Sequence, residues 1–299
     1  MNKLRGAAST IRMSAREWLD DKASMLAAAL SFFAILSLAP LLLLIVSVTG
    51  ILIGEGEAKQ EIISRAGDAV GESGRVLAQT VLDNAGRSAG GVLGAILGAV
   101  LLLFGATGLF AQLQSALNRV WHVEPEPGKG ARKFLKKRLL SFLVILGVGF
   151  LLLFSLVLGA ITTAAAEWSA TFLGVSNWLP FLINLTGSLV LLIFLFAFIY
   201  KVLPDVEIGW PEVWYGAFFT AVLFVIGNIL IGFYLRNSGT ASTYGAFGSL
   251  VVVLLWVYYS AQVVLFGAEF TKVYARRHGN PLRPQAGARR VPGARLDRV

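Results

Sequence analysis

A single carboxylate stands at the end of the last long apolar stretch of the chain. Glu269 follows a run without charged residues at 237–268. An ionisable side chain in a membrane-spanning helix is costly, and those that occur usually serve ions, protons or substrates. Its candidate partners are cations at the same predicted membrane boundary, namely Lys201, Arg119 and Lys272. The alternative interpretation is a structural ion pair that only holds helices together.

Neutral polar side chains recur within the other apolar stretches. In lipid such groups hydrogen-bond between helices, at roughly 0.6–2 kcal/mol each, or they line a path for a polar solute. The sequence leaves both interpretations open. The candidates for a polar path or core are Gln112, Asn118, Asn184, Asn228, Tyr259, Ser260 and Gln262, together with the charged Glu269, Lys201 and Arg119.

The residue types that most enzymes use are scarce. The chain has two histidines, His122 and His278, and no cysteine, which excludes disulfides, thiolate metal sites and cysteine nucleophiles. It contains no zinc-protease, serine-hydrolase, Walker or dinucleotide-binding motif. Asp205 and Glu207 lie close together but are weak as a metal site by themselves. We therefore expect no catalytic residue, no metal and no cofactor, and a protein that is not an enzyme.

Long stretches without Asp, Glu, Lys or Arg define the elements that must position these residues. Each stretch predicts one helix, because a charge at a membrane helix centre costs about 2.5–3.5 kcal/mol and a span needs about 20 residues. None alternates as a barrel strand would. The predicted spans lie near 28–53, 91–113, 140–163, 181–203, 213–235 and 247–271. The expected fold is therefore an all-α polytopic membrane bundle of six transmembrane helices.

Basic residues are distributed unevenly between the two sides of this predicted bundle. The side that includes both termini carries 21 Lys and Arg, and the opposite side carries 5. The positive-inside rule then predicts an inner-membrane protein with both termini in the cytoplasm. Anionic lipid headgroups are the expected partners of the basic loop and tail. The short basic stretch at 132–138 enters a span directly, so we expect no nucleic-acid binding.

The predicted spans divide the chain into a leader, a membrane domain and a tail. The leader at 1–27 contains a predicted interfacial helix around Trp18. The transmembrane domain covers 28–275. The tail at 276–299 is rich in Pro, Gly and Arg and is predicted to be disordered.

Two connections of the membrane domain are long enough to have structure of their own. The external loop at 54–90 is acidic, and its apolar residues recur at helical spacing. We therefore predict two short amphipathic helices there, separated at Gly71 and Gly74. The connection at 114–139 is predicted to be a basic cytoplasmic loop.

Four stretches resemble the YihY/virulence factor BrkB family of bacterial inner-membrane proteins. They are ALSFFAILSLAPLLLLIV at 29–46, LLLFGATGLFAQLQSALNRVW at 101–121, YKVLPDVEIGWPEVWYGAFFTAVLF at 200–224 and YGAFGSLVVVLLWVYYSAQVVLFGAEF at 244–270. The resemblance implies a six-helix inner-membrane protein. It singles out, without assigning roles, Tyr200, Pro204, Tyr244, Gly248, Trp256, Tyr259, Ser260, Gly267 and Glu269.

The same resemblance implies little about mechanism. Members of the family are linked to serum resistance, a relative is linked to lipopolysaccharide or lipid export, and the family once carried a ribonuclease label. Three functions follow as hypotheses. The first is a transporter or a protein that handles lipid or another envelope component. The second is a scaffold that supports envelope assembly through membrane-protein partners, and the third and least supported is a ribonuclease.

Overall fold

The computed structural model describes residues 2–88, 108–126, 178–237, 248–278 and 282–291, and most of them are helical. The helices are α1 (Asn2–Asp20), α2 (Ala23–Ile53), α3 (Glu55–Val70), α4 (Glu72–Ser88), a further helix at 108–120, α7 (Trp178–Val202), α8 (Trp210–Asn237) and α10 (Gly248–Arg277). The strands are β1 (Val123–Pro125), β2 (Val206–Glu207), β3 (Arg283–Pro284) and β4 (Ala288–Arg290).

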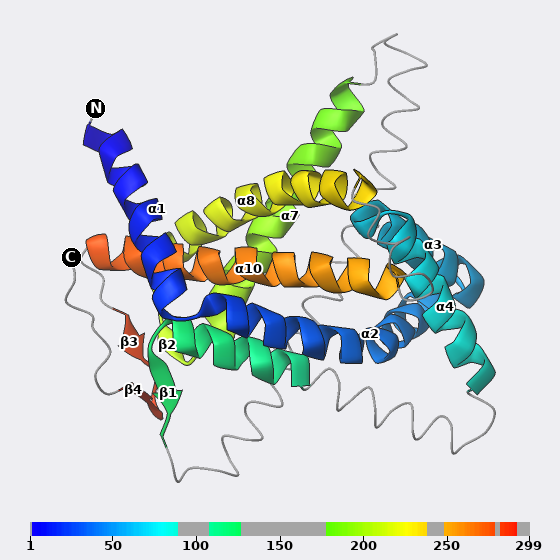
Figure 1. The fold of residues 1–299 in the computed structure, drawn as a ribbon, viewed down its shortest axis with the longest axis horizontal. Helices are drawn as coiled ribbons and strands as arrows, with labels where there is room; N and C mark the ends of the chain where they lie inside the picture. Colours follow the sequence, from blue (N-terminus) through cyan, green and yellow to red (C-terminus); the bar gives the residue numbers. More distant parts are fainter. Residues whose placement is uncertain (1, 89–107, 127–177, 238–247, 279–281, 292–299) are drawn as a thin grey trace.

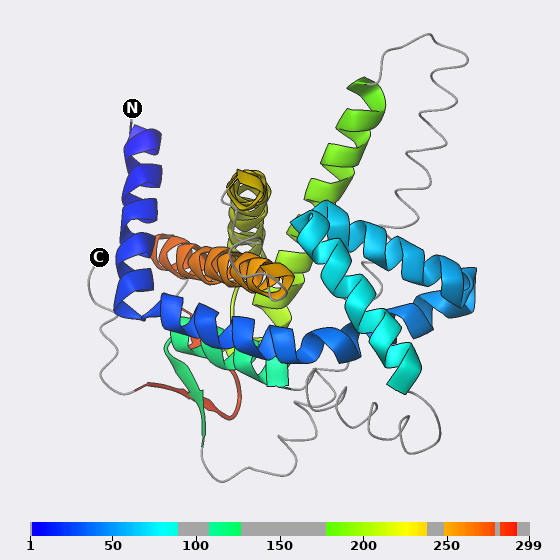
Figure 2. The ribbon, with the colours of Figure 1, turned by 45° about the vertical axis from the view of Figure 1, so that its right-hand side comes forward.

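Helix α10 lies at the centre of this arrangement. It packs against α2 along one side and against α8 along another, and α7 packs against α8 (Figure 1). Helices α3 and α4 form a hairpin at one end of α2 and α10. The helix α1 and all four strands lie at the opposite end, which both views show (Figures 1 and 2).

Among the described residues, three helices are long and apolar enough to cross a membrane. They are Leu185–Val202, Trp210–Phe233 and Gly248–Arg277, which coincide with the spans predicted near 181–203, 213–235 and 247–271. Parts of α1 and α2 together form a fourth candidate span if they are counted as one bent helix.

That fourth candidate is a bent pair, Ala8–Asp20 followed by Ala23–Ala39, with an angle of 68° between the two helices. The predicted span at 28–53 lies within α2. The predicted span at 140–163 and most of that at 91–113 lie outside the described residues. The structure therefore gives three or four spans in its described part, and six remains a prediction.

One face of α8 is apolar and uncovered. Ile226, Ile229, Leu230 and Phe233 are each more than half exposed, and their spacing places them on one helical stripe. A soluble protein seldom leaves such a stripe open, whereas lipid solvates it. This face supports membrane insertion of α8 independently of its length.

The predicted all-α fold is helical in most described residues but also contains four short strands, and the prediction of a disordered tail at 276–299 is wrong for the part of the tail that the structure describes. Helix α10 continues to Arg277, and the tail supplies β3 and β4. Strand β4 pairs antiparallel with β1, and β3 pairs antiparallel with β2. Composition could not reveal this, because the strands that satisfy the tail's backbone groups come from distant parts of the chain.

Two other helix boundaries differ from those predicted. The segment predicted as a loop from residue 114 is still helical up to residue 120 and then enters β1. The leader helix predicted around Trp18 extends over Asn2–Asp20 as α1. Helix α2 begins at Ala23, before the predicted start of the first span at 28.

The two amphipathic helices predicted in the loop at 54–90 are confirmed as α3 and α4. Gly71 separates them with φ of 74°, a left-handed conformation that favours glycine. Gly74 lies where an added Cβ would be 2.3 Å from the carbonyl oxygen of Ala66. The hairpin therefore closes because glycine occupies both positions.

Helices α8 and α10 approach each other through two reciprocal glycine–threonine contacts. A Cβ on Gly216 of α8 would lie 1.9 Å from Oγ1 of Thr271, and a Cβ on Gly267 of α10 would lie 1.9 Å from Oγ1 of Thr220. Each threonine hydroxyl donates to the glycine carbonyl one turn earlier in its own helix, at 2.7 and 2.8 Å. Small residues spaced by four thus set the distance between the two helices.

Replacement of Gly267 by Ala should separate α8 from α10. The new methyl group meets both Thr220 and the hydroxyl of Tyr200, 2.5 Å away, so we expect a loss of about 1–3 kcal/mol in stability. Gly56→Ala is the matched control, because no atom lies within 4 Å of that position. Thermal unfolding of the two purified variants in detergent measures the difference. Equal melting temperatures would contradict this packing.

Candidate functional site

A buried ammonium group lies near the end of α10, where α1 and the end of the helix at 108–120 meet it. Lys272 is 1% exposed, and its Nζ lies 2.6 Å from Oε2 of Glu269, 2.8 Å from Oε2 of Glu17 and 3.2 Å from Oδ2 of Asp21. It also donates to the carbonyl oxygen of Val120, at 2.6 Å. Four oxygens thus surround a group that has three protons to donate.

Glu269 is the most buried acid of this group. Its side chain has no exposed surface, and it follows Gly267 and the buried Ala268. Its Oε2 forms a close ion pair with Lys272 Nζ at 2.6 Å, and its Oε1 accepts no hydrogen bond from the described residues. Such an acceptor keeps its capacity to bind a proton or another donor.

The charges of α1 and α10 are complementary along their contact. Lys272 and Arg276 are four residues apart and lie on one face of α10. Glu17 and Asp21 are also four residues apart, and Asp21 directly follows the last residue of α1. Arg276 Nη2 forms an ion pair with Glu17 Oε1. These contacts hold α1 against α10 at the steep angle seen in Figure 2.

Hydroxyl groups extend the same contact toward the start of α1. Arg277 Nη1 donates to Ser9 Oγ at 2.6 Å and to Thr10 Oγ1 at 2.8 Å. The interface between α1 and α10 therefore continues beyond the charged pairs.

His122 joins the site from the end of the helix at 108–120. Its Nε2 lies 2.9 Å from Oδ1 of Asp21. We call the six side chains of this site the Lys272 cluster: Glu17, Asp21, His122, Glu269, Lys272 and Arg276. Burial by itself raises the pKa of Asp21, but the hydrogen bond with His122 and the charge of Lys272 outweigh it and lower the pKa from 3.8 to about 2.

Backbone strain is concentrated beside this cluster. Lys22 and His122 have φ of 52° and 53°, which non-glycine residues rarely adopt. Lys22 forms the bend between α1 and α2, and His122 ends a helix. Both residues adjoin Asp21, one in sequence and one in space, so the ion pairs hold the backbone in this conformation.

Of the three cations predicted as partners of Glu269, the structure brings one to it. Lys272 is in contact, whereas Arg119 is exposed and Lys201 donates to the carbonyl oxygen of Ile208. The ammonium of Lys201 also lies 5.2 Å from the centre of the Trp210 ring.

The neutral polar candidates make bonds between helices and segments. Asn228 Oδ1 of α8 accepts from Trp256 Nε1 of α10 at 3.1 Å, and Ser260 Oγ donates to Trp256 O within α10. The hydroxyl of Tyr259 lies against Gly227, and a Cβ there would be 1.3 Å away. These residues lie along the contact between α8 and α10.

Asn118 links the helix at 108–120 to the turn after α7. Its Nδ2 donates to Asp205 Oδ2 and its Oδ1 accepts from the Asp205 backbone N–H, both at 2.8 Å. Gln114 donates to Asp205 Oδ1 at 3.4 Å, and the neighbouring Gln112 is half-buried. These bonds fix the turn after α7 on the helix at 108–120.

Two of the predicted polar residues differ from the rest. Gln262 Oε1 is buried and accepts no hydrogen bond from the described residues. The side chain of Asn184 lies outside the described part of the structure, although its backbone belongs to α7.

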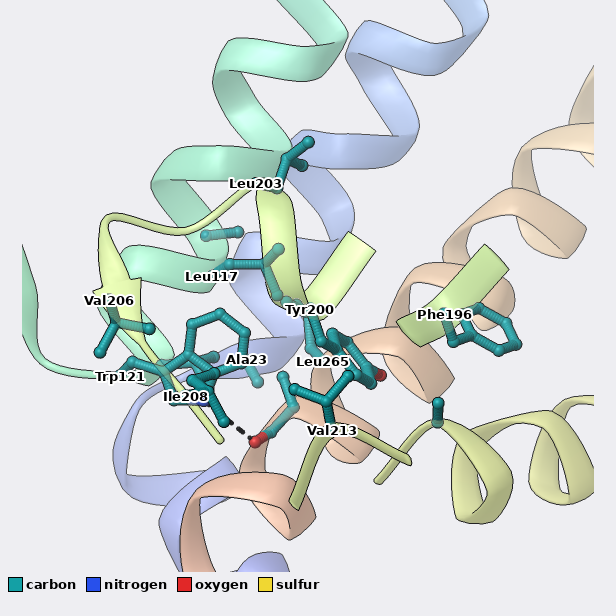
Figure 3. Close-up of a cluster of buried hydrophobic side chains, with 14 of the residues drawn as sticks. Ala23, Leu117, Trp121, Phe196, Tyr200, Leu203, Val206, Ile208, Val213 and Leu265 are labelled. Atoms are coloured by element: carbon teal, nitrogen blue, oxygen red, sulfur yellow. Dashed lines mark hydrogen bonds between the residues drawn. The ribbon is translucent and has the colours of Figure 1, made fainter. Parts of the chain in front are cut away.

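A group of buried apolar side chains lies next to the Lys272 cluster. Figure 3 shows Trp121, Tyr200 and Leu265 among the side chains of one buried group. Trp121 Nε1 donates to the carbonyl oxygen of Ala268 at 3.3 Å, next to Glu269. The Tyr200 hydroxyl donates to the carbonyl oxygen of Val264 at 2.7 Å, so both aromatic residues bind the last turns of α10.

Sequence reasoning missed Glu17, Asp21, His122 and Arg276 as members of the site. A signal was present in the spacing of opposite charges, since an acidic pair at i and i+4 in the leader matches a basic pair at i and i+4 after Glu269. Within the described residues no group of three or more His, Asp or Glu side chains could hold a metal ion. Carboxylates around an ammonium can instead bind or release protons.

Replacement of Asp21 by Asn should remove a stabilisation that depends on pH. Because its folded-state pKa is lowered, the carboxylate contributes about 2 kcal/mol above pH 4, and this is lost as the pH falls from about 4 to about 2. We expect a lower melting temperature than wild type at pH 7 and a converging one near pH 2. Asp20→Asn, an exposed neighbour, is the control. A deficit of equal size at both pH values would refute this role.

The sequence is similar to those of several known membrane proteins. The chain is 32% identical over 179 residues to a UPF0761 membrane protein of Tolumonas auensis, and this match covers 58% of this chain and 55% of the relative. It is 30% identical over 270 residues to a UPF0761 membrane protein of Pseudomonas aeruginosa (strain LESB58), which covers 86% of this chain and 60% of the relative. The chain therefore spans somewhat more than half the length of these relatives.

A third relative, of Bacillus subtilis (strain 168), is named the ribonuclease-like protein YfkH. It is 24% identical over 260 residues, which cover 85% of this chain and 90% of that protein. No solved structure matches the chain. The family described as virulence factor BrkB matches residues 14–292, which include every member of the Lys272 cluster. The chain belongs to the virulence factor BrkB family of membrane proteins.

Proposed function

We propose that this protein is a multi-pass inner-membrane transporter that handles a lipid or another envelope component, and that Glu269 binds a proton during the cycle. The observation that carries the proposal is the complete burial of Glu269, whose Oε1 accepts no hydrogen bond from the described residues. A buried carboxylate in a membrane helix is expensive to keep unless it has a use. No catalytic chemistry is required of it.

The balance of charge in the Lys272 cluster favours proton uptake. Three carboxylates, Glu17, Asp21 and Glu269, face two permanent cations, Lys272 and Arg276. One added proton therefore neutralises the cluster while His122 is neutral. Glu269 is the one carboxylate of the three whose side chain is wholly buried, so we expect it to gain most from becoming neutral.

Movement of α1 is the mechanical consequence of this step. A neutral Glu269 binds Lys272 less strongly, which leaves the ammonium to Glu17 and Asp21 of the leader. The contact between α1 and α10 then tightens, and it loosens again when the proton leaves. We propose both termini in the cytoplasm, on the basis of the uneven distribution of Lys and Arg, which would place the cluster at the cytoplasmic end of α10.

A scaffold protein is the second candidate. The bonds from Asn228 to Trp256 and from Asn118 to Asp205 favour it, because they hold helices together in the way that structural glue does. Ribonuclease activity has less support. It is suggested by the name of the YfkH relative and by the former label of the family, and the carboxylate of Asp205 is already bound by Asn118 and Gln114.

The Glu269→Gln variant separates the first two candidates. The amide keeps the shape of the side chain but cannot bind and release a proton, so we expect complementation of a deletion strain to fall about tenfold. Protein abundance should remain near that of wild type. Glu57→Gln on α3, an exposed carboxylate, is the matched control. Measured together, immunoblots and the envelope phenotype distinguish loss of function from loss of protein.

The outcomes are distinct. A joint fall in abundance and function supports the scaffold, and wild-type behaviour of Glu269→Gln refutes a role for this residue in transport. A second measurement needs no known substrate. Trp121 donates to Ala268 beside Glu269, so its fluorescence should change with pH in wild type and not in Glu269→Gln.

A further inference from the structure

A polar cavity of about 400 Å³ lies apart from the Lys272 cluster, where the ends of several elements meet. The end of α7, strand β2, the start of α8, the end of α10 and the segment around β3 all contribute to its wall. Its volume is within the range of pockets that bind small molecules. The tail contributes a wall only because β3 pairs with β2.

The charged groups of the cavity are balanced in sign. Lys201 and Arg283 are basic, Glu207 and Glu212 are acidic, and Gln285 is neutral. Glu207 of β2 and Arg283 of β3 are opposite each other in the antiparallel pairing of these strands. The side chains of these two described residues do not form an ion pair with each other. A simple anion or a simple cation would leave one sign unused, whereas a molecule with both charges can use the two signs together.

Aromatic residues place the cavity at the level of lipid headgroups. Trp210, at the start of a membrane-spanning helix, is 53% exposed, and Trp214 and Tyr215 follow it on the surface. Tryptophan and tyrosine gather at the boundary between lipid and water. The Trp210 ring contacts Lys201 of the cavity wall, so the boundary and the cavity adjoin.

We propose that this cavity binds the headgroup of an amine-bearing zwitterionic phospholipid. The phosphate lies toward Lys201 and Arg283, and the amine lies toward Glu207 and Glu212. The lipid chains leave along the aromatic surface of α8 into the membrane. This site goes beyond the proposed transport function, because it requires no proton on Glu269 and serves a tightly held structural lipid equally well.

Lipid binding to the full-length protein in detergent tests the site by native mass spectrometry. Dioleoylphosphatidylethanolamine should bind one to one and more tightly than dioleoylphosphatidylglycerol. Arg283→Gln and Glu207→Gln should each weaken phosphatidylethanolamine binding about tenfold, because each removes one of the two recognised charges. Arg119→Gln and Glu57→Gln alter exposed charges elsewhere and should bind as wild type does.

Two comparisons can overturn the proposal: binding of phosphatidylethanolamine against phosphatidylglycerol, and binding of the lipid against its soluble headgroup. Glu207→Gln should reduce the preference for phosphatidylethanolamine over phosphatidylglycerol, so equal binding of the two lipids by wild type contradicts recognition of the amine. Soluble glycerophosphoethanolamine should compete poorly because it lacks chains, and competition at equal concentration contradicts a lipid source. Unchanged binding in both cavity variants, with unchanged melting temperature, shows that the cavity is not the site.

Discussion

The burial of the Lys272 ammonium is the constraint on which the rest of this structure depends. Removing such a group from water costs several kcal/mol, and the cost is offset only where oxygens surround it closely. Those oxygens come from Glu17 and Asp21 of the leader, from Val120 and from Glu269. The position of α1, the end of the helix at 108–120 and the last turns of α10 are therefore determined together, although they lie far apart in the chain.

The membrane-facing part follows a different principle. Helices α8 and α10 approach closely through small residues, with Gly216 and Gly267 each admitting a threonine of the other helix. The opposite face of α8 is apolar and open, as lipid requires. Polar bonds such as that between Asn228 and Trp256 lie within this contact. Packing sets the helix spacing, and charges organise one end of the bundle.

That same end contains both the Lys272 cluster and the headgroup-sized cavity. The two share α10, since Lys272 and Ala275 are within one turn of each other and face different neighbours. The tail connects them to the rest of the chain by pairing β4 with β1 and β3 with β2. The proton binding and the lipid binding that we propose are therefore separate chemical events on one structural element.

The sequence by itself determined the apolar helices, the two helices of the loop at 54–90 and Glu269 as the carboxylate of interest, with Lys272 among its partners. These depend on local properties: the absence of charge over the length of a span, helical spacing, and glycine at Gly71. Only the tertiary structure decided that Glu17, Asp21 and His122 complete the site, and that the tail forms strands. Those contacts join residues more than seventy positions apart, and neither composition nor periodicity specifies which distant groups meet.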